Sequence, residues 1–161
     1  MSDIVYDLGY YEKDAEDIIH LCSTWWEDSA FYKNTNMPFK VDRSQFKAMS
    51  DTGQILAITG RKEDTGELIA CYVGSITPYY FNPDYLMASE IVWCIHKDYR
   101  KGREMFNLLK AIELGMKTRK VNMYTLCIPI LEGKEMIEKY MTRKLDFFVQ
   151  DSVLMKEVKY G

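Results

Sequence analysis

The sequence has few of the residues that build metal clusters and disulfide frameworks. It contains two His and four Cys in 161 residues, and no two cysteines form a CxxC pair. Zinc sites and small disulfide-stabilised folds need denser spacing of such residues. We therefore predict no metal site, and we expect buried thiols in a reducing compartment. The four cysteines are Cys22, Cys71, Cys94 and Cys127.

Long apolar runs and targeting signals are also missing. No apolar stretch approaches the roughly 20 residues that a membrane-spanning helix needs. The N-terminal segment MSDIVYDLGYYEKD lacks the basic and apolar regions of a signal peptide. We expect a cytoplasmic protein with no membrane partner.

The charges are unevenly distributed, although the net charge is only -3 and the composition (47% hydrophobic, 28% charged) is typical of a globular protein. We predict one domain over residues 1–161. The segment from Lys97 to Lys120 has eight Lys and Arg against three Asp and Glu, a net charge of +5, which leaves -8 for the rest of the chain. A basic block in an acidic chain indicates a local anionic ligand, and no nucleic-acid partner is expected.

Hydrophobic periodicity and turn residues predict an α+β domain in the order β-α-α-β-β-β-α-β-α-β-β. Asp42 is the expected N-cap of the second helix, and Asp64-Thr65-Gly66 the expected hairpin turn. TPYYFNPDY is expected to be an aromatic loop that forms a substrate pocket or a partner surface. The predicted helices are 11–32, 41–53, 102–118 and 132–144, and the predicted strands are 4–6, 54–61, 67–81, 85–96, 120–130 and one or two within 145–158.

A basic turn, Arg100-Lys101-Gly102-Arg103, connects a strand-like run to a helical pattern. A helix N-terminus has unpaired N–H groups and about half a positive charge, and a Gly-containing turn lets those groups approach a phosphate. The turn matches neither GxxxxGK[ST] nor GxGxxG. The residues alone leave two interpretations open, a phosphate site or a solvated charged turn.

The segment EIVWCIHKDYRKGREMFNLLKAIE resembles the acetyl-CoA motif of the GNAT superfamily, the Gcn5-related N-acetyltransferases, in which a strand leads through [Q/R]-x-x-G-x-[G/A] into a helix with paired leucines. Ile95 corresponds to the strand end, Arg100 to the leading Arg, and Leu108-Leu109 to the leucine pair. The resemblance covers about residues 50–158. Within the superfamily the sequence most resembles a small phage-encoded branch, which would place the protein in the cytoplasm of a host cell. Arg103 and Met105 stand where the motif has small residues.

The resemblance implies a GNAT-like, mixed but mostly antiparallel sheet of six to seven strands flanked by helices. It implies transfer of an acetyl group from acetyl-CoA to a primary amine, on a small molecule or a protein, by direct attack in a ternary complex. It also allows a homodimer through an edge strand. Its implied cofactor-binding residues are Ile95, Arg100, Lys101, Gly102, Arg103, Glu104 and Met105. The altered motif keeps open an alternative, a catalytically inactive GNAT-fold binding or virion-associated protein.

Glu90 is the candidate general base, because it is the only acid in the apolar run YLMASEIVWCIH. A structural carboxylate is the alternative. Strand alternation predicts that Glu90 shares a face with Val92 and Cys94. The resemblance implies that the Ile95 N–H polarises the thioester and that a tyrosine protonates the thiolate. That tyrosine's position is Thr142 here, which makes Tyr140 the candidate acid and Tyr124 a second one.

Overall fold

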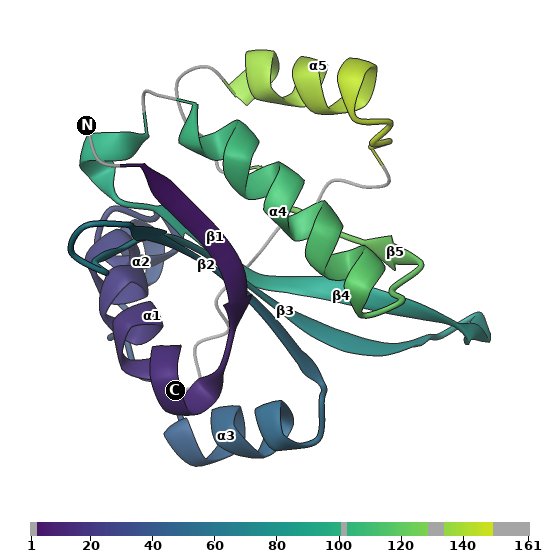
Figure 1. The fold of residues 1–161 in the computed structure, drawn as a ribbon, viewed down its shortest axis with the longest axis horizontal. Helices are drawn as coiled ribbons and strands as arrows, with labels where there is room; N and C mark the ends of the chain where they lie inside the picture. The colour runs from purple at the N-terminus through teal and green to yellow at the C-terminus, as the bar shows by residue number, and fades with distance from the viewer. Residues whose placement is uncertain (1–2, 101–102, 129–133, 150–161) are drawn as a thin grey trace.

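The computed structural model describes residues 3–100, 103–128 and 134–149. These residues form one sheet with helices on both of its faces (Figure 1). The elements are β1 (Ile4–Gly9), α1 (Tyr11–Trp26), α2 (Ala30–Thr35), α3 (Arg43–Asp51), β2 (Ile55–Lys62), β3 (Leu68–Tyr79), β4 (Asn82–Ile95), a 3-10 turn (Lys97–Tyr99), α4 (Glu104–Thr118), β5 (Met123–Tyr124) and α5 (Lys134–Lys144).

The sheet order is β1-β2-β3-β4-β5, so each strand lies beside its neighbour in sequence. The first four strands pair antiparallel, whereas β5 pairs with β4 in parallel. The predicted α+β class and mostly antiparallel sheet are confirmed. The described residues contain five strands, fewer than the six to seven predicted. Residues 145–149 form no strand, and the rest of the predicted closing strands lies outside the described residues.

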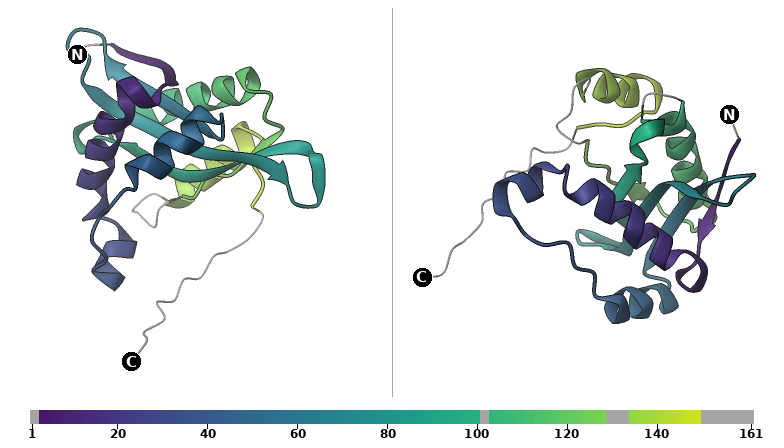
Figure 2. Two further views of the ribbon diagram at one scale, coloured as in Figure 1. Left: turned by 90° about the horizontal axis from the view of Figure 1, so that it is seen from below. Right: turned by 90° about the vertical axis from the view of Figure 1, so that its left-hand side faces the viewer.

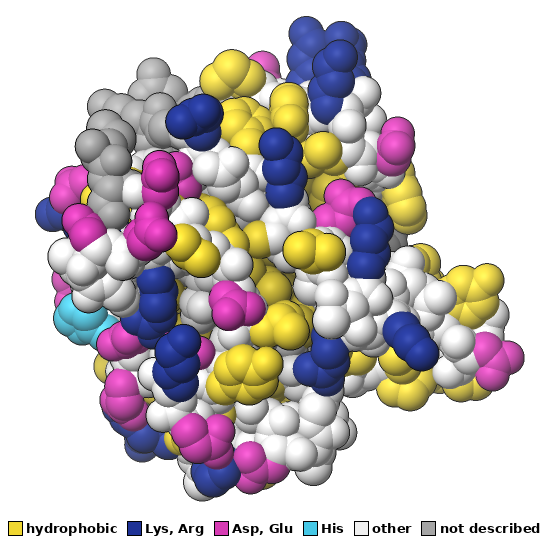
Figure 3. Space-filling model, viewed as in Figure 1, with side chains coloured by type: hydrophobic (Ala, Val, Ile, Leu, Met, Phe, Trp, Pro, Cys, Tyr) yellow, Lys and Arg dark blue, Asp and Glu magenta, His cyan; other side chains and the backbone are white. Residues whose placement is uncertain are grey.

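Two apolar layers cover the sheet, because alternate residues of each strand face opposite sides. Leu56, Ile58 and Tyr72 pack on the side that α4 covers. Ile55, Ala57, Cys71 and Val73 pack on the side that α1 covers. Figure 2 shows α1 and α3 on the opposite side of the sheet from α4. Figure 3 shows the α4 side, where Lys and Arg side chains are scattered among acidic ones and do not form one patch.

The predicted first helix is interrupted, because α1 ends at Trp26 and α2 begins only at Ala30. Ser29 ends the gap between them, where its hydroxyl accepts a hydrogen bond from the Tyr32 N–H at 3.1 Å and caps α2. Asp42 caps α3 as predicted, accepting from two backbone N–H groups.

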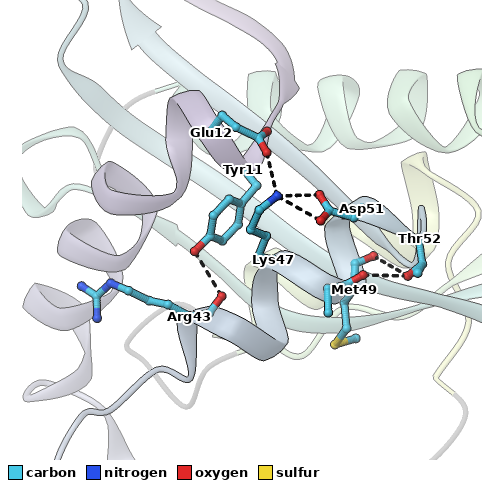
Figure 4. Close-up of polar contacts among 8 residues, drawn as sticks. Tyr11, Glu12, Arg43, Lys47, Met49, Asp51 and Thr52 are labelled. Carbon is cyan, nitrogen blue, oxygen red and sulfur yellow. Dashed lines mark hydrogen bonds and ion pairs between the residues drawn. The ribbon is translucent and has the colours of Figure 1, made fainter.

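Polar contacts on the protein surface hold α3 against α1 (Figure 4). The Arg43 guanidinium contacts the Glu16 carboxylate at 2.7 and 2.9 Å. Lys47 lies 3.0 Å from Glu12, and the Tyr11 hydroxyl donates to the Arg43 carbonyl. Helix α3 has no buried residue. Exposed ion pairs stabilise a fold by only about 0–1 kcal/mol each. The partly buried Phe46 and Met49, which pack on the α1-side core, also anchor α3.

A buried ion pair joins α1 to β2. The Asp14 carboxylate lies 2.7 Å from the Arg61 guanidinium and also accepts from the Tyr10 N–H at 2.8 Å. The side chain of Asp14 is 1% exposed, whereas that of Asp17, which contacts the same guanidinium, is 54% exposed. Burial of a carboxylate is tolerated here because it has a cation and an N–H donor as partners.

The two antiparallel hairpins differ in length. The predicted turn at Asp64-Thr65-Gly66 is confirmed, with Gly66 at φ +71°. The predicted aromatic loop is instead the tip of a long hairpin, since β3 runs to Tyr79 and β4 begins at Asn82. Tyr80 and Phe81 at the tip are 88% and 81% exposed. The hairpin projects beyond the helices (Figure 1).

The chain after α4 has less regular structure than the sequence predicted. The strand predicted over 120–130 is the two-residue β5, Met123–Tyr124. Among the described residues, no helix is both long and apolar enough to cross a bilayer. The single domain over 1–161 stays a prediction.

Candidate active site

A bulge in β4 lies next to the candidate base. Val92 pairs with Val73 and Glu90 pairs with Gly74, which leaves Ile91 without a partner on β3. The extra residue reverses the alternation that the sequence suggested. Val92 and Cys94 face the α1 side, but Glu90 does not share their face, so that prediction is wrong. Bulges frequently redirect side chains beside functional sites.

Glu90 lies where β4 and the chain after β5 separate. The last paired residues are Ala88 and Tyr124. Beyond them the Glu90 carboxylate accepts a hydrogen bond from the Cys127 N–H, and the Glu90 N–H donates to the Thr125 hydroxyl. Burial raises the pKa of Glu90 to about 7, against the opposing effect of the Cys127 N–H. A carboxyl with this pKa can take up and release a proton near neutral pH.

Tyr72 on β3 has an unsatisfied hydroxyl beside Glu90. Its side chain is fully buried, and its oxygen has no hydrogen-bond partner among the described residues. Burial, followed by the nearby charges of Glu90 and Tyr124, raises the pKa of Tyr72. Gly74 makes room for the hydroxyl, because a Cβ there would lie 2.2 Å from it. A buried donor without a partner indicates a site for water or a ligand atom.

Trp93 also spans the separation between β4 and the chain after β5. Its indole N–H donates to the Cys127 carbonyl at 2.8 Å. Cys127 therefore binds β4 side chains through both its N–H and its carbonyl. These two hydrogen bonds connect β4 to the chain after β5 at Cys127.

The backbone of Ile95 is directed away from β3. The next residue, His96, donates its N–H to the Ile69 carbonyl on β3 at 2.7 Å. Successive residues in a strand direct their backbone groups to alternate sides, so the N–H and carbonyl of Ile95 point toward the separation. The carbonyl accepts from the Arg100 guanidinium at 2.9 Å. Arg100 is thereby positioned beside the end of β4.

The N-terminus of α4 is partly available for binding an anion. Arg103 at the N-cap forms no side-chain capping bond. The Glu104 carboxylate accepts from the Tyr6 hydroxyl at 2.8 Å. Met105 is half-buried and packs on the core. The other two predicted cofactor-binding residues, Lys101 and Gly102, lie outside the described residues.

The candidate acids have different surroundings. The ring of Tyr140 packs on Phe106 of α4, with centroids 4.5 Å apart. The Thr142 hydroxyl donates to the Glu138 carbonyl within α5 at 2.9 Å. Tyr124 pairs with Ala88, and burial raises its pKa to about 12. Of the two candidate acids, Tyr124 is therefore the nearer to Glu90 in the sheet register, whereas the ring of Tyr140 contacts α4.

An apolar cavity of about 400 Å³ opens between α1, α3 and the sheet. The bulge residue Ile91 and its neighbour Val92 form part of its wall, so the cavity reaches the bulge beside Glu90. Its other lining residues are Ile18, Ile19, Cys22, Trp25, Trp26, Phe39, Val41, Asp42, Gln45, Phe46, Met49, Ile55 and Val73.

Sequence reasoning missed Tyr72, Trp93 and the backbone of Cys127 as parts of this region. The pair Tyr72 and Gly74 on one strand face was a usable signal, because a Gly two residues from a large side chain leaves space above the strand. The contacts of Cys127 had no such signal, since they depend on how far β4 and the following chain diverge.

Comparison with known proteins gives a fold but no close relative. No protein-family model and no curated protein sequence matches the chain. Many solved structures are similar to the chain, and three that are similar over nearly its whole length are described below. A ribosomal-protein-alanine N-acetyltransferase from Brucella melitensis biovar Abortus 2308 is 12% identical, with a TM-score of 0.63, over 96% of this chain and 99% of that one.

The other two structures belong to enzymes with different acceptors in their names. An aminoglycoside acetyltransferase from an uncultured soil metagenomic sample, solved with trehalose, is 10% identical, with a TM-score of 0.70, over 97% of both chains. Glucosamine-6-phosphate N-acetyltransferase from Arabidopsis thaliana is 11% identical, with a TM-score of 0.63, over 96% of this chain and 97% of that one. The chain therefore has the GNAT fold, the fold of the Gcn5-related N-acetyltransferases.

Proposed function

We propose that the protein is an N-acetyltransferase that moves an acetyl group from acetyl-CoA to a primary amine by direct attack in a ternary complex. The observation that carries this proposal is the Glu90 carboxylate, which has a pKa of about 7 and lies where β4 separates from the chain after β5. The similarity in fold to three acetyltransferases supports the reaction class.

Glu90 acts as the general base. Its carboxylate removes a proton from the acceptor ammonium, directly or through a water held by the Tyr72 hydroxyl. The freed amine nitrogen forms a bond to the thioester carbonyl carbon, and the carbon–sulfur bond breaks. The Ile95 N–H donates to the carbonyl oxygen as its negative charge develops. The thiolate then takes a proton from a tyrosine, with Tyr140 and Tyr124 as the two candidates, and the second proton that the acylated nitrogen loses restores the neutral tyrosine.

Arg100 and Arg103 bind the pyrophosphate, together with the free N–H groups of α4. Arg100 is positioned through its bond to the Ile95 carbonyl, and Arg103 stands at the uncapped helix N-terminus. Both guanidiniums supply charge-assisted hydrogen bonds to phosphate oxygens. Lys101, Gly102, Glu104 and Met105 complete the proposed loop.

The acceptor binds in the apolar cavity between α1, α3 and β4. Aromatic and aliphatic side chains form most of its lining, and Asp42 and Gln45 are its polar members. An acceptor with an apolar body and a terminal amine suits this cavity, because the body displaces water from apolar walls. Since the cavity lies on the α1 side and Glu90 faces the α4 side, the amine must pass the bulge at Ile91, where β4 separates from the chain after β5, to reach the carboxylate. The class of acceptor, small molecule or protein, stays a prediction.

A second candidate function is binding without catalysis. The observation that favours it is the bond from Trp93 to Cys127, which closes part of the separation where the thioester would have to lie. Met105, in place of a small residue at the start of α4, acts in the same direction. The experiment that separates the two candidates is an assay of CoA release with a panel of primary amines. Release that needs both the amine and Glu90 supports the transferase, and absence of release with every amine supports the binding protein.

A further inference from the structure

Three of the four cysteines meet on the α1 side of the sheet. Cys71 on β3 lies directly opposite Cys94 on β4, with their sulfurs 3.5 Å apart. Cys22 on α1 lies above them, and its sulfur is 3.9 Å from that of Cys94. All three sulfur atoms are within 4.8 Å of one another. All three cysteines are buried, whereas Cys127 is exposed.

The distances suit a single ion bound by three sulfurs. A metal–thiolate bond of about 2.3 Å places three sulfurs evenly around one ion about 4 Å apart. The two measured separations, 3.5 and 3.9 Å, lie close to this value. A disulfide would need an S–S distance of about 2.05 Å. The three side chains are therefore arranged as separate thiols around a common point.

The number and type of donors limit which ion fits. Among the described residues, no His, Asp, Glu or fourth Cys joins this cluster. Structural zinc sites and iron–sulfur clusters take four protein ligands, catalytic zinc sites with three protein ligands need a water or substrate as the fourth, and hard ions take oxygen ligands. Cu(I) prefers soft sulfur donors. Three thiols in an apolar layer, without an oxygen or nitrogen ligand, favour Cu(I) over these alternatives.

An entry path reaches the cluster. Cys22 forms part of the wall of the apolar cavity between α1, α3 and the sheet. Met49 on α3 lines the same cavity. A thioether is a second soft donor for Cu(I). An incoming ion would thus meet Met49 and Cys22 before Cys71 and Cys94.

We propose that Cys22, Cys71 and Cys94 form a binding site for one Cu(I) ion. None of its three side chains takes part in the chemical steps of the proposed acetyl transfer, although Cys22 also lines the cavity proposed for the acceptor. The proposal gives a function to the three buried cysteines on the α1 side of the sheet.

The test is an anaerobic titration of the full chain with Cu(I) in the presence of a chromophoric Cu(I) chelator. The wild-type protein should take one Cu(I) per chain from the chelator and release protons from its thiols as it does so. X-ray absorption of the loaded protein should show sulfur ligands only. Failure to compete with the chelator, or oxygen and nitrogen ligands around copper, would overturn the proposal.

Cysteine variants locate the ion. Cys71→Ala and Cys94→Ala should each weaken binding by about 100-fold or more, since loss of even an outer-shell partner costs 10–100-fold. Cys127→Ala is the matched control, and it should bind as wild type does. Circular dichroism of each variant establishes that it is folded. If a folded Cys94→Ala protein keeps the affinity, or Cys127→Ala loses it, the ion binds elsewhere and the proposal is wrong.

Discussion

The carboxylate of Glu90 accepts a hydrogen bond from the backbone N–H of Cys127, so one side chain spans the separation between β4 and the chain after β5. Burial raises the pKa of this carboxyl to about 7 even though the N–H opposes the rise. If Glu90 had only a structural role, we would expect a fully ionised carboxylate paired with a cation. Within the described part of the chain, no Lys, Arg or His forms an ion pair with Glu90, whose carboxylate accepts instead from the Cys127 N–H, and we therefore assign Glu90 the role of base.

Glu90→Gln should lower kcat for acetyl transfer by about 10²–10⁴-fold, because an amide cannot accept the ammonium proton. The wild-type rate should rise with pH through about 7, since the deprotonated carboxylate is the active form, and the variant should lose this step. Measuring kcat/KM from pH 5 to 9 checks both. Glu63→Gln, at an exposed position near the β2–β3 turn, should match the wild type.

Unfolding of the same variant provides a control for its structure. A carboxyl whose pKa is raised on folding binds more protons in the folded chain, so it lowers stability as pH rises from about 4.5 to about 7. Glu90→Gln should therefore be roughly 1–3 kcal/mol more stable than wild type at pH 8 and equal to it at pH 4. A variant that loses both activity and stability at pH 8 would contradict the assignment of Glu90 as a base.

Tyr72→Phe should leave the fold intact or stabilise it. The buried hydroxyl has no partner among the described residues, and such a group costs about 1–3 kcal/mol. If the hydroxyl positions water for Glu90, kcat should fall while KM for acetyl-CoA stays unchanged. Urea unfolding and steady-state kinetics measure the two effects. A stabilised variant with full activity would remove Tyr72 from the mechanism.

Asp14→Asn should destabilise the fold by about 3 kcal/mol or more, because it leaves Arg61 half-buried without its closest buried partner. Asp17→Asn changes an exposed carboxylate on the same guanidinium and should cost less than about 1 kcal/mol. Urea unfolding of the two variants gives a matched comparison. Equal losses would show that burial does not determine the strength of this ion pair.

Straight-chain primary amines should become better acceptors as they lengthen. Each methylene buried in the apolar cavity contributes about 0.8 kcal/mol, or about fourfold in kcat/KM, until the cavity is filled. Amines of equal length that carry hydroxyl groups are the control, and they should gain little. If kcat/KM does not change with the length of the amine, the acceptor binds outside the cavity between α1, α3 and β4.

The order of elements could be predicted from the sequence because periodicity and turn residues are local. The α4 helix, the Asp42 cap and the turn at Gly66 all follow from neighbouring residues. The direction of Glu90 could not be predicted, since the bulge at Ile91 arises from pairing with β3. The meeting of Cys22, Cys71 and Cys94 likewise depends on packing of α1 over two strands, and their wide spacing had suggested no metal site.

Binding of acetyl-CoA tests the central claim most directly. Calorimetric titration should show binding to the wild type and affinity at least about tenfold lower for Arg100→Ala/Arg103→Ala, because two charge-assisted hydrogen bonds to phosphate are lost. Lys117→Ala, at the far end of α4, is the control and should bind as wild type does. The contradictory result is no binding near 1 mM, which corresponds to about -4 kcal/mol, or undiminished binding by the double variant.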